Sequence, residues 1–252
     1  MSRLSLVWDG TWLTWTTFKD DAVGRREISR PDMVPEVLRA LRNQVGVGAQ
    51  VVFGEWGQPA TVMPQALLVE AEREANLAQW HQLHHGALAP GHSIESASLD
   101  ALPGAPWIAV AASRTWMDAA SAVFPQARHI PLTQALIHDA VTWNRSHPHD
   151  GWSFRVDVRE EGGVLVAAQG EALQWIHHLA PGSQSEDALY AMVNSAHRSD
   201  AQVHDARVRW SGSLSMVQSW DRFLHVEDVD ELRGKDNAST WKPLLHSMMA
   251  CG

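Results

Sequence analysis

The two halves of the sequence repeat one order of expected elements: three strands, a helix and a further strand. Hydrophobic periodicity places these elements in the first half at 4–18 (two runs that meet at Asp9-Gly10), 24–29, 32–42 and 49–54. In the second half it places them at 154–159, 163–168, 172–179, a helix from Ser185, and 207–210. The residues of the two halves hardly match, so the repeat lies in the element order. This order predicts a duplicated α/β fold whose two first hairpins face each other across a cleft.

The first hairpin turns at Asp9-Gly10. Both residue types tolerate the positive φ angles of a two-residue type I′ turn, so this dipeptide favours a tight hairpin. The second hairpin turns at 160–163, shortly after Asp157. Asp9 and Asp157 therefore occupy comparable places in the two halves.

Capping residues and the spacing of apolar residues predict the positions of several helices. Asp32 is expected to cap the helix at 32–42, with Pro35 in its first turn and one apolar face made by Val34, Val37, Leu38 and Leu41. A second helix is expected from about Leu67 to His84, with a stripe formed by Leu68, Ala71, Ala75 and Ala78. The helix that Pro131 starts has its stripe at Leu132, Leu136, Ala140 and Trp143. In the second half the helix from Ser185 has apolar positions Leu189, Met192, Val193 and Ala196.

The remaining segments complete the expected organisation. A loop is expected at 86–106, a buried strand at 107–112 and a helix at 214–224. The polar segment 144–151 breaks regular structure at its proline and its glycine, so the expected domains are 1–146 and 147–252.

Composition limits the partners. The formal charge of the 252 residues is −9, and lysine occurs only at Lys19, Lys235 and Lys242, so no basic stripe is available to neutralise a nucleic acid backbone. No run reaches the roughly 18 apolar residues that cross a bilayer, and no signal peptide is recognised. The single cysteine, Cys251, has no internal disulfide partner. We expect a soluble cytoplasmic protein that binds neither nucleic acid nor membrane, with most of its 13 tryptophans packed inside or along domain contacts.

Histidines raise the question of a metal site. His81, His84 and His85 have the i, i+3, i+4 spacing that can bring two imidazoles onto one metal ion, but the segment lacks a carboxylate at the H-E-x-x-H position and a cysteine partner. We expect a solvated helix end there and no metal. His177 and His178 lie in an expected strand, where adjacent side chains face opposite ways and cannot act as a pair.

Five segments carry a resemblance that covers nearly the whole chain. They are L-S-L-V-W-D-G-T-W-L-T-W near the N-terminus, V-M-P-Q-A-L-L at 62–68, F-P-Q-A-R-H-I at 124–130, D-A-L-Y-A-M-V-N at 187–194 and V-R-W-S-G-S at 208–213. In this order they resemble the actin-like ATPase superfamily, which also holds the sugar kinases and heat-shock ATPases. More closely, the chain is similar to a bacterial family of unknown function with a degenerate actin-like fold. The resemblance implies two RNase H-like lobes.

In active members of that superfamily, two hairpin turns cradle the nucleotide phosphates and a glycine pair contacts the adenosine. By resemblance, Asp9, Gly10 and Thr11 correspond to the first turn, Asp157 begins the second, and Ser211 with Gly212 corresponds to the adenosine turn.

Each of these three turns departs from the pattern. The first lacks the residue between Asp and Gly and is followed by the bulky Trp12. The second has Arg159 where a glycine is expected, followed by Glu160 and Glu161, two carboxylates that would lie beside a polyanion. The third has Ser211 in place of one glycine.

These departures predict a vestigial nucleotide cleft in a non-catalytic binding or scaffolding protein, with no cofactor and with an unidentified protein partner or a homo-oligomer. The alternative is an ATPase or kinase in which Asp9 and Asp157 position magnesium and ATP. A third possibility is a protein that works only as part of a partner-dependent complex. The fold alone does not decide between them.

Overall fold

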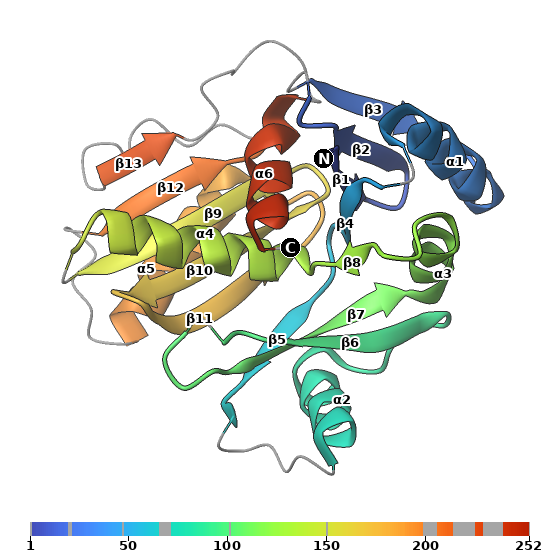
Figure 1. Cartoon of the computed structure of the whole chain (residues 1–252). Helices are drawn as coiled ribbons and strands as arrows, with labels where there is room; N and C mark the ends of the chain where they lie inside the picture. Colours follow the sequence, from blue (N-terminus) through green and yellow to red (C-terminus); the bar gives the residue numbers. More distant parts are fainter. Residues whose placement is uncertain are drawn as a thin grey trace.

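The computed structural model describes residues 2–19, 22–46, 48–65, 72–100, 102–149, 151–198, 206–213, 225–228 and 239–251 (Figure 1). Its strands are β1 (Arg3–Trp8), β2 (Trp12–Thr16), β3 (Val23–Glu27), β4 (Gln50–Glu55), β5 (Ala60–Met63), β6 (His92–Ser98), β7 (Trp107–Ser113), β8 (Arg128–His129), β9 (Trp152–Arg159), β10 (Gly162–Gln169), β11 (Ala172–Leu179), β12 (Arg207–Ser211) and β13 (His225–Asp228). Its α-helices are α1 (Val34–Val45), α2 (Arg73–His85), α3 (Arg114–Val123), α4 (Leu132–Ser146), α5 (Ser185–Arg198) and α6 (Lys242–Cys251).

Two five-stranded sheets have the same strand order. The N-terminal sheet runs β3-β2-β1-β4-β8 and the C-terminal sheet runs β11-β10-β9-β12-β13. In each sheet the first three strands form antiparallel pairs, whereas the fourth strand lies parallel to the first. A parallel pair requires a crossover connection, which α1 supplies in the first half. The predicted duplication of β-β-β-α-β is confirmed.

Two helices fill the space between the sheets. α4 packs against β9 and β10, while α6 packs against β1 and against α4 (Figure 1). One apolar core contains residues from both sheets and both helices, among them Val52, Leu136, Val164 and Met248. Outer cores join α1 and α3 to the N-terminal sheet and α5 to the C-terminal sheet. The two halves therefore share their central core, and the domain division after residue 146 stays a prediction.

A third, smaller sheet is inserted between β4 and α3. Its order is β5-β7-β6, and α2 packs on it (Figure 1). The prediction of a loop over 86–106 is wrong in its middle part, because β6 occupies His92–Ser98. The residues of β6 are mostly half-buried and polar, so they lack the apolar run that marks a buried strand.

Several local predictions are confirmed. The four apolar positions of α1 are all buried, and Pro35 lies in the first turn of that helix. α5 begins at Ser185, with Leu189, Met192 and Ala196 buried. The stripe of α4 is buried at Leu132, Leu136 and Ala140, and half-buried at Trp143.

Other local predictions are wrong. Asp32 does not cap α1, because a 3-10 turn at Pro31–Met33 precedes the helix and Met33 takes the cap position without a side-chain hydrogen bond. α2 starts at Arg73 and buries Leu77 and His81, whereas Ala75 is exposed. The predicted helix at 214–224, and positions Leu68 and Ala71, lie outside the described residues.

Candidate functional site

The first candidate turn joins β1 to β2. It is longer than a two-residue type I′ turn, because Trp8 pairs with Leu13 and Asp9 does not have a positive φ. Gly10 alone takes the left-handed conformation there, with a φ of 95°. The turn is held by the Asp9 carboxylate, whose Oδ1 accepts hydrogen bonds from the backbone N–H groups of Thr11 (2.9 Å) and Trp12 (2.6 Å). The predicted tight type I′ turn is therefore wrong.

Arg25 connects this turn to the second one. From β3, its Nη2 lies 3.2 Å from Asp9 Oδ2 and 3.5 Å from Glu161 Oε1. Its guanidinium also lies over the Trp12 ring, 4.8 Å from the ring centroid. The Arg25 side chain is only 10% exposed, so this cation sits between the two lobes in a largely desolvated position. The structure thus brings the two predicted turns together, through a residue that sequence reasoning did not identify.

The second candidate turn follows β9, where the side chains of Asp157 and Arg159 are fully buried. They form an ion pair in which Arg159 Nε lies 2.6 Å from Asp157 Oδ1. Asp157 Oδ2 accepts hydrogen bonds from Arg159 Nη2 (3.0 Å) and from Ser211 Oγ (2.6 Å). Ser211 Oγ accepts in turn from Arg155 Nη1 at 2.7 Å. Both oxygens of Asp9 and Oδ2 of Asp157 therefore accept hydrogen bonds from other groups of the chain, whereas Asp157 Oδ1 is held only by its ion pair with Arg159.

Two tryptophans enclose the Arg159 guanidinium. Its carbon lies 3.7 Å from the Trp241 ring centroid and 5.2 Å from that of Trp56, and the two indoles meet edge to face. Arg159 also donates hydrogen bonds to the Thr240 hydroxyl (3.3 Å) and carbonyl (3.1 Å). Trp241 is 1% exposed and Trp56 is 5% exposed. The Arg159 side chain, which occurs where a glycine is expected, therefore fills the interior beside the second turn.

Gly212 lies against β9, because Ser211 is the last residue of β12 and pairs with Asp157. The φ of Gly212 is 115°, and a Cβ placed there would lie 2.1 Å from the Val158 carbonyl oxygen. Only glycine fits this close approach of two backbones. The predicted residues Asp157, Ser211 and Gly212 therefore form one buried cluster.

A second constellation involves the histidines. His81 is buried, with its Nε2 at 3.2 Å from the Pro59 carbonyl, and His85 Nε2 lies 3.2 Å from the Ala60 carbonyl. The Ala60 N–H donates a hydrogen bond to Nε2 of His178 in β11 at 3.0 Å, so this ring nitrogen carries no proton. Burial lowers the pKa of His178 to about 4, with a further contribution from neighbouring His85.

The predicted solvated helix end is wrong for His81, which is buried and contacts the Pro59 carbonyl. His85 is exposed, as predicted, although its ring also contacts the Ala60 carbonyl. The sequence signal for this cluster is the helical spacing, which places both rings on one face of α2. In the described part of the chain, no three His, Cys, Asp or Glu side chains are placed to hold a metal ion. No described helix is long and apolar enough to cross a membrane.

Comparison with known proteins identifies the fold. No protein-family model matches the sequence, and no curated protein matches it. Solved structures do match along almost the whole chain. A Bacteroides thetaiotaomicron protein with an actin-like ATPase fold and unknown function is 13% identical, with a TM-score of 0.69 and coverage of 96% of this chain and 95% of that one.

Two further structures have lower scores. The PilM–PilN type IV pilus biogenesis complex gives a TM-score of 0.53 at 12% identity, with 98% of this chain and 99% of that chain covered. The cytoplasmic domain of EpsL, an inner membrane component of the Vibrio cholerae type II secretion system, gives 0.52 at 9% identity, covering 99% and 95%. The chain therefore has the two-lobed actin-like ATPase fold that its sequence predicts.

Proposed function

We propose that this protein is a non-catalytic binding or scaffolding protein whose nucleotide cleft is vestigial. The observation that carries the proposal is the position of Arg25, which binds Asp9 of the first turn and Glu161 of the second. These are the two turns between which the phosphates of a nucleotide would lie if the resemblance extended to function.

Electrostatics supports the proposal at the first turn. A phosphate between the turns would have to displace Arg25, or compete with Asp9 and Glu161 for it. Displacement would leave two carboxylates close to a polyanion in a poorly solvated place, which is costly. The Asp9 carboxylate is also occupied by two backbone N–H groups, so moving it toward a metal ion would break the turn that it holds.

Packing supports the proposal at the second turn. Asp157 is fully buried beside Arg159, and Arg159 is enclosed by Trp241 and Trp56. A magnesium ion at Asp157 would sit next to a buried guanidinium, where two cations repel each other strongly. The residues present therefore do not fit a magnesium nucleotide.

A binding role agrees with one of the similar structures. One of them is a complex of PilM with PilN, and we infer that this chain likewise contacts a protein partner or a second copy of itself. We place it in the cytoplasm because its single cysteine forms no disulfide within the chain. Light scattering on the purified protein will measure its oligomeric state.

Calorimetric titration with magnesium and ATP tests the vestigial cleft. We expect no heat of binding at nucleotide concentrations up to about a millimolar, the range that covers typical enzyme substrates. The control is Asp118→Asn, which changes an exposed side chain of α3. Micromolar binding that disappears in the Asp9→Asn, Asp157→Asn double variant but persists in this control would overturn the proposal. That result would instead support the ATPase or kinase alternative.

A further inference from the structure

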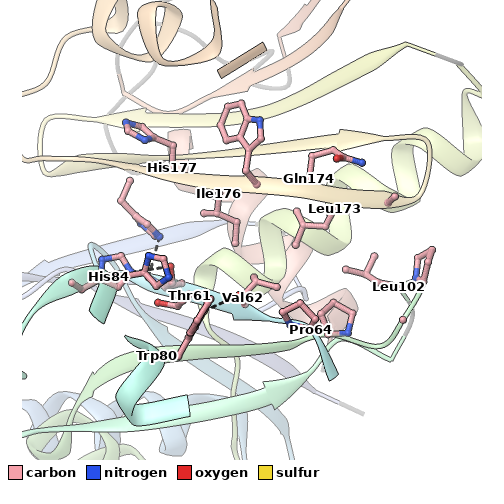
Figure 2. A pocket seen from close by; sticks show the side chains of 18 residues that line it. Thr61, Val62, Pro64, Trp80, His84, Leu102, Leu173, Gln174, Ile176 and His177 are labelled. Atoms are coloured by element: carbon pink, nitrogen blue, oxygen red, sulfur yellow. Dashed lines mark hydrogen bonds between the residues drawn. The ribbon is translucent and has the colours of Figure 1, made fainter. Parts of the chain in front are cut away.

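A groove of about 670 Å³ lies between β11 and the small sheet (Figure 2). One side is formed by β11, the other by β5 and α2, and the segment from Leu102 to Pro106 contributes at one end. The hydrogen bond from Ala60 to His178 joins the two sides. The groove belongs to neither of the candidate turns, because none of their residues lines it.

The β11 side of the groove is a free strand edge. β11 is the last strand of its sheet and pairs only with β10 among the strands that the structure describes. All seven consecutive residues from Ala172 to His178 line the groove. Because alternate side chains of a strand point to opposite faces, such a continuous run means that the strand's edge, with its backbone N–H and C=O groups, borders the groove.

The β5 side is closed to strand pairing. The Ala60 N–H and carbonyl are taken by His178 and His85, and the Val62 carbonyl accepts a hydrogen bond from Trp80 Nε1 at 3.3 Å. Side chains from α2 and β11 thus cover the outer edge of β5, as proteins commonly do with exposed edges. A segment that enters the groove can form a ladder of backbone hydrogen bonds only with β11.

The composition of the walls between these edges bears on the charge of an occupant. Among the residues that the structure describes, no Asp, Glu, Lys or Arg lines the groove, although the chain carries 49 such residues. Leu173 and Ile176 point from β11 toward Val62 and Pro64, whereas His177 points away from them (Figure 2). Trp80 adds an indole face from α2. An occupant that carried a charge here would lose its hydration without gaining a counter-ion.

We propose that the groove binds an extended, uncharged peptide segment of a protein partner, which adds as a strand to the free edge of β11. This inference rests on the proposed binding function and specifies the chemistry of the partner. The seven lining residues of β11 span about 20 Å, enough for a peptide of about six residues. Backbone hydrogen bonds to β11 would give affinity, and apolar side chains at alternate positions would enter the space between Leu173 and Trp80.

The length of the exposed edge favours a peptide over a compact small molecule. A small apolar ligand could use the side-chain walls but would leave most of the backbone donors and acceptors of β11 without protein partners. A peptide strand satisfies them in a regular ladder while it covers Leu173 and Ile176. The bulge in the β10–β11 pairing lies near Leu173, so the part of the edge from Trp175 to His178 keeps regular register.

Selection from a displayed library of peptides of about six residues, with the full chain as bait, tests the proposal. We expect the selected peptides to be uncharged with apolar residues at alternate positions, and to bind one per chain. N-methylation of alternate backbone amides should weaken binding by at least about tenfold, because it removes the ladder donors. Hydrogen exchange should slow at β11 amides when the unmodified peptide is bound, a readout that needs no variant.

Leu173→Arg places a charge in the groove and should weaken peptide binding by at least about tenfold. Leu83→Arg makes the same substitution on α2 at a side chain that is 72% exposed and outside the groove, and should leave affinity unchanged. If no peptide is selected, if binding resists Leu173→Arg and N-methylation, or if only an apolar dye binds, the proposal is wrong. Those outcomes would leave the nucleotide titration, and with it the vestigial cleft, unaffected.

Discussion

The guanidinium of Arg159 lies 3.7 Å from the ring centroid of Trp241, although the two residues are 82 positions apart. Both side chains are almost fully buried, and the charge of Arg159 is balanced by Asp157 at 2.6 Å. The contact joins the second candidate turn to the segment that leads into α6. The position at which the resemblance leads us to expect a glycine is therefore occupied by a core side chain.

Trp241→Ala should destabilise the protein by about 3–5 kcal/mol, because it removes a large buried side chain and the aromatic face over Arg159. Trp241→Phe should cost less, since it keeps an aromatic ring. Trp12→Ala is the comparison: Trp12 is only partly buried, so its loss should cost clearly less. Urea unfolding followed by far-ultraviolet circular dichroism measures the stability of all three variants. An equal cost for Trp241→Ala and Trp12→Ala would contradict the deeper burial of Trp241.

Arg25→Ala should lower the free energy of unfolding by about 1–3 kcal/mol, because it leaves Asp9, which is 2% exposed, without its cation. Arg30→Ala provides a matched control. Arg30 pairs with Asp32, and both side chains are 70% exposed, so its loss should change stability by less than about 0.5 kcal/mol. Chemical denaturation of both variants checks the difference in free energy of unfolding. This difference should shrink little in high salt, because the Arg25–Asp9 pair is largely shielded from solvent.

Gly212→Ala should be severely destabilising, by several kcal/mol or to the point of preventing folding, since its Cβ would lie 2.1 Å from the Val158 carbonyl oxygen. Gly170→Ala is the control, because it introduces backbone strain without a steric conflict. Gly170 also has a positive φ, 57°, but no atom lies within 4 Å of a Cβ placed there. Its substitution should cost only about 1–2 kcal/mol. Thermal melts of the two variants should therefore differ widely; similar melting temperatures would argue against the close contact.

Stability should fall as the pH is lowered from about 6.5 to about 4. Burial lowers the pKa of His178 to about 4 and that of His129 to about 4 in the folded protein, below the ordinary value of 6.5. Between these values the unfolded chain binds protons that the folded chain does not, so acid favours unfolding. Each group contributes a loss of about 3 kcal/mol once the pH is below both values.

His178→Gln tests the assignment of this pH dependence. Glutamine offers a carbonyl oxygen that can accept the Ala60 N–H, but it does not titrate. The decrease in unfolding free energy between pH 7 and pH 4.5 should be smaller in this variant, and the His129 contribution should remain. An unchanged pH dependence would show that His178 does not contribute.

The repeated element order could be predicted from the sequence because it depends on local periodicity. The apolar face of α1 and the alternation of apolar and polar residues along β9 each identify their element without reference to distant residues. α3 has similar signals, since Ser113 caps it and Trp116, Ala120 and Val123 form its buried stripe, but no element was predicted there. The polar β6 lacks such a signal.

The contacts of the candidate site could be predicted only in part. The motif comparison found Asp9, Asp157 and Ser211, and it identified Arg159 as a departure from the expected glycine. It could not show that Arg25 bridges the turns or that Trp241 covers Arg159, because these contacts join distant parts of the chain. The sequence shows that these residues are charged or aromatic, but which residues they contact depends on tertiary packing.

The position of α6 has a consequence for biosynthesis. Met248 of this helix belongs to the core beneath β1 and lies 3.8 Å from Ser5, a residue 243 positions earlier. A ribosome releases β1 and β4 long before it makes residues 242–251, so the face of the nascent N-terminal sheet that α6 covers lacks this helix during most of translation. The newly made chain should therefore depend on chaperones, and a ribosome stalled before α6 should hold a protease-sensitive intermediate.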